Sequence, residues 1–61
     1  MDRTDLVILG HLADGKTVEY VARRLDVSER TVRRRLRVIA DHLGVDSTIE
    51  VVVHAVRRGL I

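Results

Sequence analysis

Signals that start and stop α-helices recur four times along this chain of 61 residues. Each predicted helix follows a residue that favours the N-cap position and carries apolar residues three and four positions apart. Three of the four glycines stand where a predicted helix ends. The sequence therefore predicts an all-α fold with helices over residues 3–13, 18–25, 29–43 and 48–58.

The last of these segments also has features of a β-strand. Residues 49–56 are rich in β-branched side chains, which favour strands. However, residues 47–50 read Ser-Thr-Ile-Glu, the form of a capping box at a helix start, and Gly59 follows as a helix stop. A lone strand would also have no partner, so we expect a helix here.

The size and composition of the chain exclude several classes of function. Residues 1–61 form one small domain, too small to enclose a typical catalytic cleft, so we expect no enzyme activity and no cofactor. Without cysteine there is no disulfide and no Cys-based zinc site, and His11, His42 and His54 lack the spacing of a metal site. No apolar run could span a membrane and no signal peptide is present, which favours a cytoplasmic location.

Positive charge is concentrated in one part of the chain. Residues 23–37 contain seven arginines against two acidic residues, a net charge of +5, whereas the remainder of the chain carries −3. Five of the arginines lie between positions 30 and 37, with only Glu29 and Asp41 near enough to neutralise them. Such a patch favours an anionic polymer as partner.

Two short predicted helices joined by three residues, 18–25 and 29–43, have the form of a helix-turn-helix. Ala22 is small where the helices must approach, and Val32 would fill the space between them. The second helix would enter the major groove of duplex DNA, where an arginine can donate two hydrogen bonds to guanine. The predicted base contacts are Arg33, Arg34 and Arg37. The predicted phosphate contacts are Arg23, Arg24, Ser28, Arg30, Thr31 and Arg35.

The last predicted helix carries apolar residues on two sides. We expect the stripe of Ile49, Val52, Val53, Val56 and Leu60 to be buried. Val51 and Ala55 then form a second apolar edge beside His54 and Arg58. Scattered exposed apolar residues are normal on any protein surface, but this edge could also join two copies. A two-fold pair would place two recognition helices about 34–36 Å apart, one turn of DNA.

The chain resembles the LuxR/GerE/FixJ-type DNA-binding domain over nearly its whole length. The resemblance rests on residues spread from Ala13 to Leu60, and it implies a four-helix domain that commonly dimerises through its fourth helix. It implies base contacts at Arg33, Arg34 and Arg37 and a phosphate contact at Thr31. The matching residues are Ala13-Asp14-Gly15, Val21-Ala22-x-x-Leu25-x-Val27-Ser28-x-x-Thr31-Val32-Arg33, Ile39, Leu43-Gly44-Val45, Glu50 and Gly59-Leu60.

The chain departs from the pattern of this family at several positions. Arg35 replaces a usual histidine at the edge of the core stripe, where it either reaches a phosphate or packs structurally. Tyr20 replaces a glutamate, Asp26 replaces the turn glycine, and Asp46 and Thr48 replace basic residues. Family members usually carry an N-terminal receiver or ligand-sensing domain, so the chain is either a stand-alone member or an excised domain.

These observations predict a sequence-specific, duplex-DNA-binding transcription regulator of the bacterial cytoplasm, associated with the nucleoid and acting as a homodimer. One alternative is a module similar to sigma-factor region 4, which binds promoter DNA while contacting RNA polymerase. Another is a protein-interaction module whose basic helix docks on an acidic partner.

Overall fold

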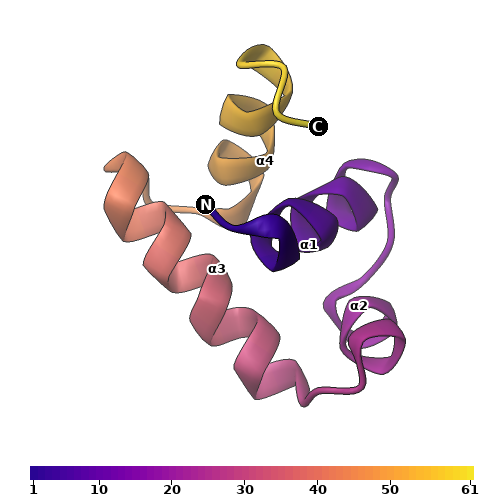
Figure 1. Cartoon of the computed structure of the whole chain (residues 1–61). Coiled ribbons are helices and arrows are strands. Elements are labelled where there is room, and N and C mark those ends of the chain that lie inside the picture. The colour runs from indigo at the N-terminus through magenta and orange to yellow at the C-terminus, as the bar shows by residue number, and fades with distance from the viewer.

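The computed structural model describes residues 1–61 as four helices without a strand. The helices are α1 (Arg3–Ala13), α2 (Val18–Leu25), α3 (Glu29–Leu43) and α4 (Thr48–Arg57). The predicted all-α fold is confirmed, and only the end of the last helix differs, by one residue. The long helix α3 has α2 at its N-terminal end and α4 at its C-terminal end, and α1 packs against all three (Figure 1). None of the four helices is long and apolar enough to cross a membrane.

A side-chain oxygen fixes the start of every helix. In each case this oxygen accepts a hydrogen bond from the backbone N–H three residues later, which satisfies one of the free donors at a helix start. The four predicted N-cap residues are therefore confirmed. The capping pairs are Asp2 with Asp5 at 2.9 Å, Thr17 with Tyr20 at 3.0 Å, Ser28 with Thr31 at 3.0 Å and Ser47 with Glu50 at 3.2 Å.

Helices α2 and α3 are joined by a turn of three residues, 26–28. The chain reverses at Asp26, whose φ of 57° and ψ of 45° lie in the left-handed region. This conformation is strained for most residues with a side chain, and aspartate is one of the few that adopts it. The turn holds α3 at a fixed angle to α2, which is the geometry predicted for a helix-turn-helix.

Replacing Asp26 with glycine is expected to stabilise the domain. Glycine adopts the left-handed conformation without steric cost, and the change also removes a negative charge from the C-terminal end of α2. We expect a gain of roughly 0.5–1 kcal/mol in the free energy of unfolding, measured by chemical denaturation. Gly44→Ala is the opposite control, because Gly44 has a φ of 70° and should lose stability. A less stable Asp26→Gly variant would contradict the assigned strain.

The core contains only small and medium aliphatic side chains. Val21 and Ala22 of α2 meet Val32 and Leu36 of α3, as the apolar spacing of these helices predicts. Val32 has no exposed surface and fills the space between the two helices. The full buried set is Ile8, Leu9, Val21, Ala22, Val32, Leu36, Ile39, Val51 and Ala55.

The predicted orientation of α4 is wrong. Val51 and Ala55, expected on an exposed edge, are fully buried, whereas Ile49, Val53 and Val56 are 73%, 42% and 51% exposed. Because α4 has apolar residues on both sides, periodicity alone does not determine which side faces the core. The side with the small Ala55 one turn after Val51 packs inward, where it allows close approach of α1 and α3. Val51 and Ala55 therefore cannot contact a second copy of the folded chain.

Candidate nucleic-acid interface

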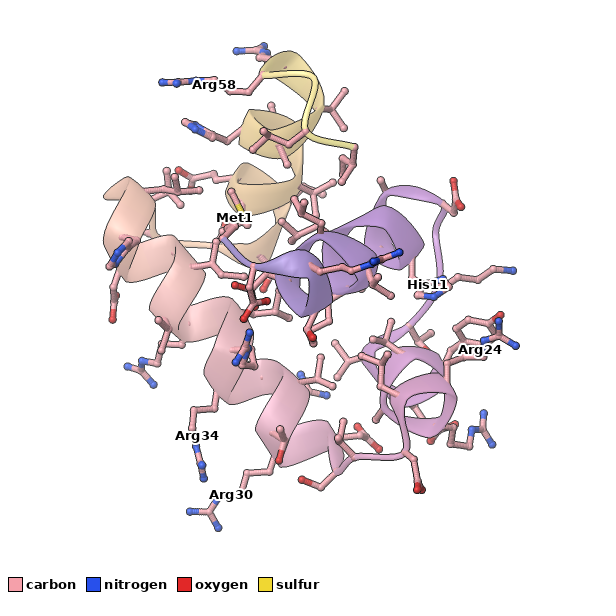
Figure 2. All side chains as sticks on the ribbon, in the orientation of Figure 1. Met1, His11, Arg24, Arg30, Arg34 and Arg58 are labelled. Carbon is pink, nitrogen blue, oxygen red and sulfur yellow. The ribbon has the colours of Figure 1, made fainter.

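Four arginines lie on the outer side of α3. Arg30, Arg33, Arg34 and Arg37 are all exposed, because the buried residues of this helix occupy its opposite side. Arg30 and Arg34 extend into solvent from the first half of the helix, well clear of the other helices (Figure 2). The structure thus presents all three predicted base-contacting arginines on the accessible part of α3.

The arginine face of α3, defined as these four residues, is almost unneutralised. Only Arg33 has an acidic partner, Glu29, with 3.4 Å between Arg33 Nη2 and Glu29 Oε1. Both side chains are exposed, and such a pair contributes little to stability. Four neighbouring positive charges with one weak partner can therefore receive an anionic ligand without first breaking a strong internal ion pair.

Polar groups at the start of α3 adjoin this face. The Ser28 hydroxyl accepts from the Thr31 backbone N–H and lies 3.0 Å from the Thr31 hydroxyl. One of these two hydroxyl protons is therefore used internally, while the backbone N–H groups of Glu29 and Arg30 in the first turn have no acceptor within the chain. A helix N-terminus of this kind favours a phosphate oxygen.

The two arginines of α2 are placed differently. Arg23 and Arg24 are exposed in the last turn of α2, and Arg23 Nη2 lies 3.2 Å from Glu19 Oε1. Arg24 points away from Arg30 and Arg34, on the α2 side of the molecule (Figure 2). The structure therefore does not bring the predicted phosphate contacts into one cluster.

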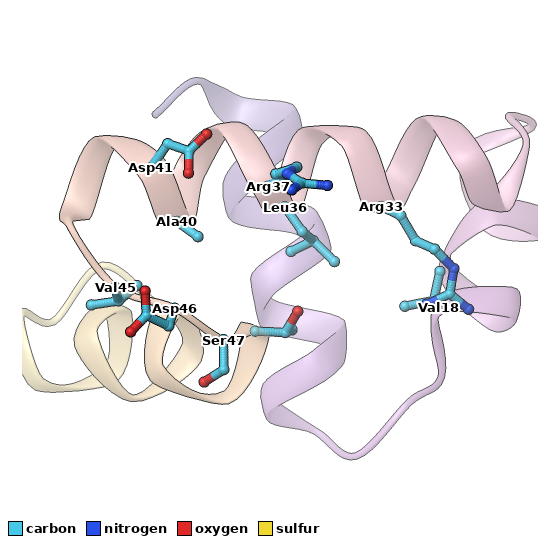
Figure 3. A pocket seen from close by; sticks show the side chains of 10 residues that line it. Val18, Arg33, Leu36, Arg37, Ala40, Asp41, Val45, Asp46 and Ser47 are labelled. Carbon is cyan, nitrogen blue, oxygen red and sulfur yellow. The ribbon is translucent and has the colours of Figure 1, made fainter.

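An open polar groove of about 440 Å³ runs beside α3, between this helix and the loop that leads to α4 (Figure 3). Arg33 and Arg37 line its wall along α3, and Asp41 and Asp46 line its other end. The groove therefore combines a positive part, which attracts phosphate, with an acidic part, which repels it. The sequence predicted the exposed arginines, but it did not predict that Asp41 and Asp46 would line the same groove as Arg33 and Arg37.

Arg35 does not take the predicted role of a phosphate contact. Its Nη2 lies 2.6 Å from Asp2 Oδ2 and 2.7 Å from Asp5 Oδ1, and its Nε donates to Asp5 Oδ1 at 2.9 Å. The prediction is wrong because Arg35 lies on the side of α3 that faces α1, where both carboxylates engage its guanidinium. From the sequence, Asp2 is expected only as the N-cap of the first helix and Asp5 only as a carboxylate suited to its first turn, since nothing local connects Asp5 to a residue 30 positions away.

A protein-family model described as "Bacterial regulatory proteins, luxR family" matches residues 3–55, which span all of α1, α2 and α3. The chain belongs to this family. It is a DNA-binding domain of the LuxR type, with its helix-turn-helix formed by α2 and α3, and the family is one of transcription regulators.

A curated relative of the chain is also named as a transcription regulator. The chain is 37% identical over 57 residues to the transcriptional regulatory protein YdfI of Bacillus subtilis (strain 168). The match covers 93% of this chain but only 27% of YdfI, so the chain spans about a quarter of the length of that relative. No solved structure matches the chain.

Asp46→Lys is expected to strengthen DNA binding of this LuxR-family domain for every sequence. Asp46 stands where the family usually has a basic residue, and it lies in the groove beside the arginine face. Lysine there would remove a repulsive charge and offer one further phosphate contact. The salt dependence of log K should steepen by about one unit, measured by fluorescence anisotropy at several salt concentrations. An unchanged slope would show that the acidic end of the groove lies away from the DNA.

The cluster of Asp2, Asp5 and Arg35 should make the stability of the LuxR-family domain depend on pH in acid. The backbone N–H of Asp5 and the Arg35 guanidinium hold the pKa of Asp2 below its ordinary 3.8. A lowered pKa in the folded state stabilises the domain above pH 3.8, and this contribution disappears as Asp2 becomes protonated at lower pH. We expect Asp2→Asn, which keeps an N-cap oxygen, to lose less stability than the parent between roughly pH 5 and pH 2. Thermal unfolding followed by circular dichroism measures this, and equally steep losses would contradict the assignment.

Proposed function

We propose that this domain recognises a specific duplex-DNA sequence by inserting α3 into the major groove. The observation that carries the proposal is the arginine face: four exposed arginines with a single weak acidic partner, on a helix held by a helix-turn-helix. In this arrangement Arg33, Arg34 and Arg37 donate to base edges, and guanine is the base that arginine contacts best.

The remaining polar groups would fix the register of α3 on the duplex. Ser28, Arg30 and Thr31 surround the start of the helix, where free backbone N–H groups also point outward. Arg23 and Arg24 lie further along α2 and would contact flanking phosphates. Phosphate contacts of this kind position a protein on the duplex without distinguishing one DNA sequence from another.

Selection from randomised duplex DNA tests this function directly. The purified chain is mixed with the pool at near-physiological salt, and the bound fraction is sequenced. An enriched motif is the expected result. Binding without enrichment that disappears with added salt would mean that the arginines contact phosphates alone. Absence of binding would favour the protein-interaction alternative, and enrichment only in the presence of RNA polymerase would favour the module similar to sigma-factor region 4.

We further propose that two copies pair through the exposed apolar face of α4, defined as Ile49, Val53 and Val56. These residues leave a continuous apolar strip on the outside of a very small domain, which marks an interaction surface. His54 and Arg58, two of the residues first assigned to dimerisation, line a hollow of about 460 Å³ beside this strip. A second copy would cover the strip and align two recognition helices with one inverted repeat on DNA.

The charges beside this strip favour an antiparallel pairing of the two α4 helices. Glu50 and Arg57 are exposed, lie seven residues apart on the same flank, and have Val53 near their midpoint. A two-fold axis close to Val53 would bring Glu50 of each copy next to Arg57 of the other. A symmetric interface requires this kind of self-complementarity.

Charge reversal tests the pairing. Glu50→Arg and Arg57→Glu should each weaken self-association in sedimentation, because each places like charges opposite one another, and the double variant should restore it. Arg3→Glu is the control for a change of net charge, since Arg3 is exposed on α1. A double variant that associates no better than either single one would rule out the antiparallel arrangement.

Action on chromosomal DNA would place the protein at the nucleoid in the bacterial cytoplasm.

A further inference from the structure

The N-terminal half of α3 packs against both α2 and α1. Val32 has no exposed surface and belongs to the same buried cluster as Val21, Ala22 and Ile8. Beside this cluster, an open cleft of about 340 Å³ lies where α1, the end of α2 and α3 meet, and Leu25, Val27 and Arg35 are among the residues that line it. Apolar packing is therefore incomplete at the junction of the three helices, on the side where Arg35 stands.

The cluster of Asp2, Asp5 and Arg35 links α1 to α3 at the edge of this cleft. One guanidinium contacts two carboxylates at 2.6 and 2.7 Å, which fixes the plane of the group as well as its distance. The Asp5 side chain is only 12% exposed and that of Arg35 39%, so water screens this contact less than a fully exposed pair.

The two carboxylates are themselves immobilised. Asp2 and Asp5 form a reciprocal capping box, in which the Asp5 N–H donates to Asp2 Oδ1 at 2.9 Å and the Asp2 N–H donates to Asp5 Oδ2 at 3.3 Å. Arg35 is therefore tied to the rigid first turn of α1 and not to a mobile side chain. The sequence distance of about 30 residues makes this a tertiary link between two helices.

We propose that this cluster positions the recognition helix for base reading, so that Asp2, Asp5 and Arg35 determine specificity without touching DNA. Arg35 lies on the flank of α3 opposite Arg33 and Arg37, and holding one flank against α1 fixes the rotation of the helix about its axis. That rotation sets where the guanidinium forks of Arg33 and Arg37 point. Base reading by two hydrogen bonds depends on their direction, whereas phosphate attraction does not. The inference rests on the proposed recognition of DNA through α3.

The double variant Asp2→Asn/Asp5→Asn tests the cluster, because asparagine keeps the capping oxygen and removes both charges. The matched control is Asp14→Lys, which changes the net charge by the same two units at an exposed acid that forms no ion pair. Affinity is measured for the duplex selected by the parent chain and for a scrambled duplex of equal length. We expect the ratio of the two affinities to fall about tenfold in the test variant and to stay constant in the control.

The direction in which each of the two affinities changes distinguishes a positioning role from a purely electrostatic role and from a loss of folding. Positioning predicts weaker binding to the selected duplex and equal or stronger binding to the scrambled one, because the variant is more positive. A purely electrostatic role would strengthen both affinities together, and a loss of folding would weaken both together. Either of these parallel changes would overturn the proposal.

Residual dipolar couplings of backbone amides provide a second readout that needs no DNA. We expect the couplings of the test variant to show α3 rotated about its own axis relative to α1, and those of the control to show the rotation of the parent. An unchanged rotation of α3 in the test variant would overturn the proposal even if a specific duplex had been found. A changed rotation in a chain that selects no sequence would instead mean that the recognition proposal fails while the cluster still orients α3.

Discussion

Val51→Glu is expected to unfold the domain. Val51 has no exposed surface and lies in a core without polar groups to receive a carboxylate. Burying an unpaired charge costs several kcal/mol, whereas a domain of this length has a total stability of roughly 3–9 kcal/mol. Far-UV circular dichroism should show loss of most helical signal at room temperature, or a melting temperature lowered by tens of degrees. A variant that melts like the parent would mean that α4 presents its other side to the core.

Val53→Glu is the matched control, because it introduces the same charge two residues away on the exposed side of α4. Val53 is 42% exposed, and a glutamate there can remain in water. We expect its melting temperature to stay close to that of the parent and its self-association to weaken. Together the two variants separate the core side of α4 from the proposed pairing side, which no single substitution does.

Arg33→Ala and Arg37→Ala are each expected to lose about 1–3 kcal/mol of binding free energy on the preferred DNA sequence. Each removes a guanidinium that, on the proposed recognition of DNA, donates two hydrogen bonds to one base, so discrimination should relax at that base pair alone. The measurement is a competition titration of the selected duplex against single-base variants. Equal losses on all duplexes would reassign both residues to phosphate contacts.

Arg23→Ala supplies the contrast for these two variants. Arg23 is exposed on α2 and is predicted to contact a flanking phosphate. Its removal should weaken all sequences alike and lower the salt dependence of log K by about one unit. A base-specific loss in this variant would move the reading surface from α3 toward α2.

Most of the fold follows from local chemistry. Thr17, Ser28 and Ser47 cap helices because a short side-chain oxygen can reach the N–H three residues ahead, an interaction within four consecutive residues. The pairing of α2 with α3 follows from a single apolar stripe on each helix and from the three-residue turn, which leaves few alternative arrangements. The outward direction of Arg30 and Arg34 then follows from the burial of Val32 and Leu36 on the opposite side.

The orientation of α4 and the ion pairs of Arg35 could not be predicted from the sequence, for different physical reasons. In α4 both sides are apolar, so the choice of Val51 over Val53 for the core depends on how closely α1 and α3 can approach, which local periodicity does not contain. Arg35 could not be assigned because its partners, Asp2 and Asp5, become neighbours only after α1 has packed on α3. A cluster of arginines in a sequence predicts an anion-binding face. It does not predict which of these arginines forms an ion pair within the protein instead.

The acidic end of the groove beside α3 affects how fast a domain of this kind would locate its operator. Asp41 and Asp46 shorten the positive surface, and the whole chain carries only +2. Each phosphate contact that is lost weakens attachment to non-cognate DNA, through which a regulator slides and hops during its search. Residence times on wrong sequences would therefore be short, and more of the genome would be sampled per unit time. A weak general attraction to DNA thus favours rapid exchange between sites, and the base contacts proposed for α3 would determine where the search stops.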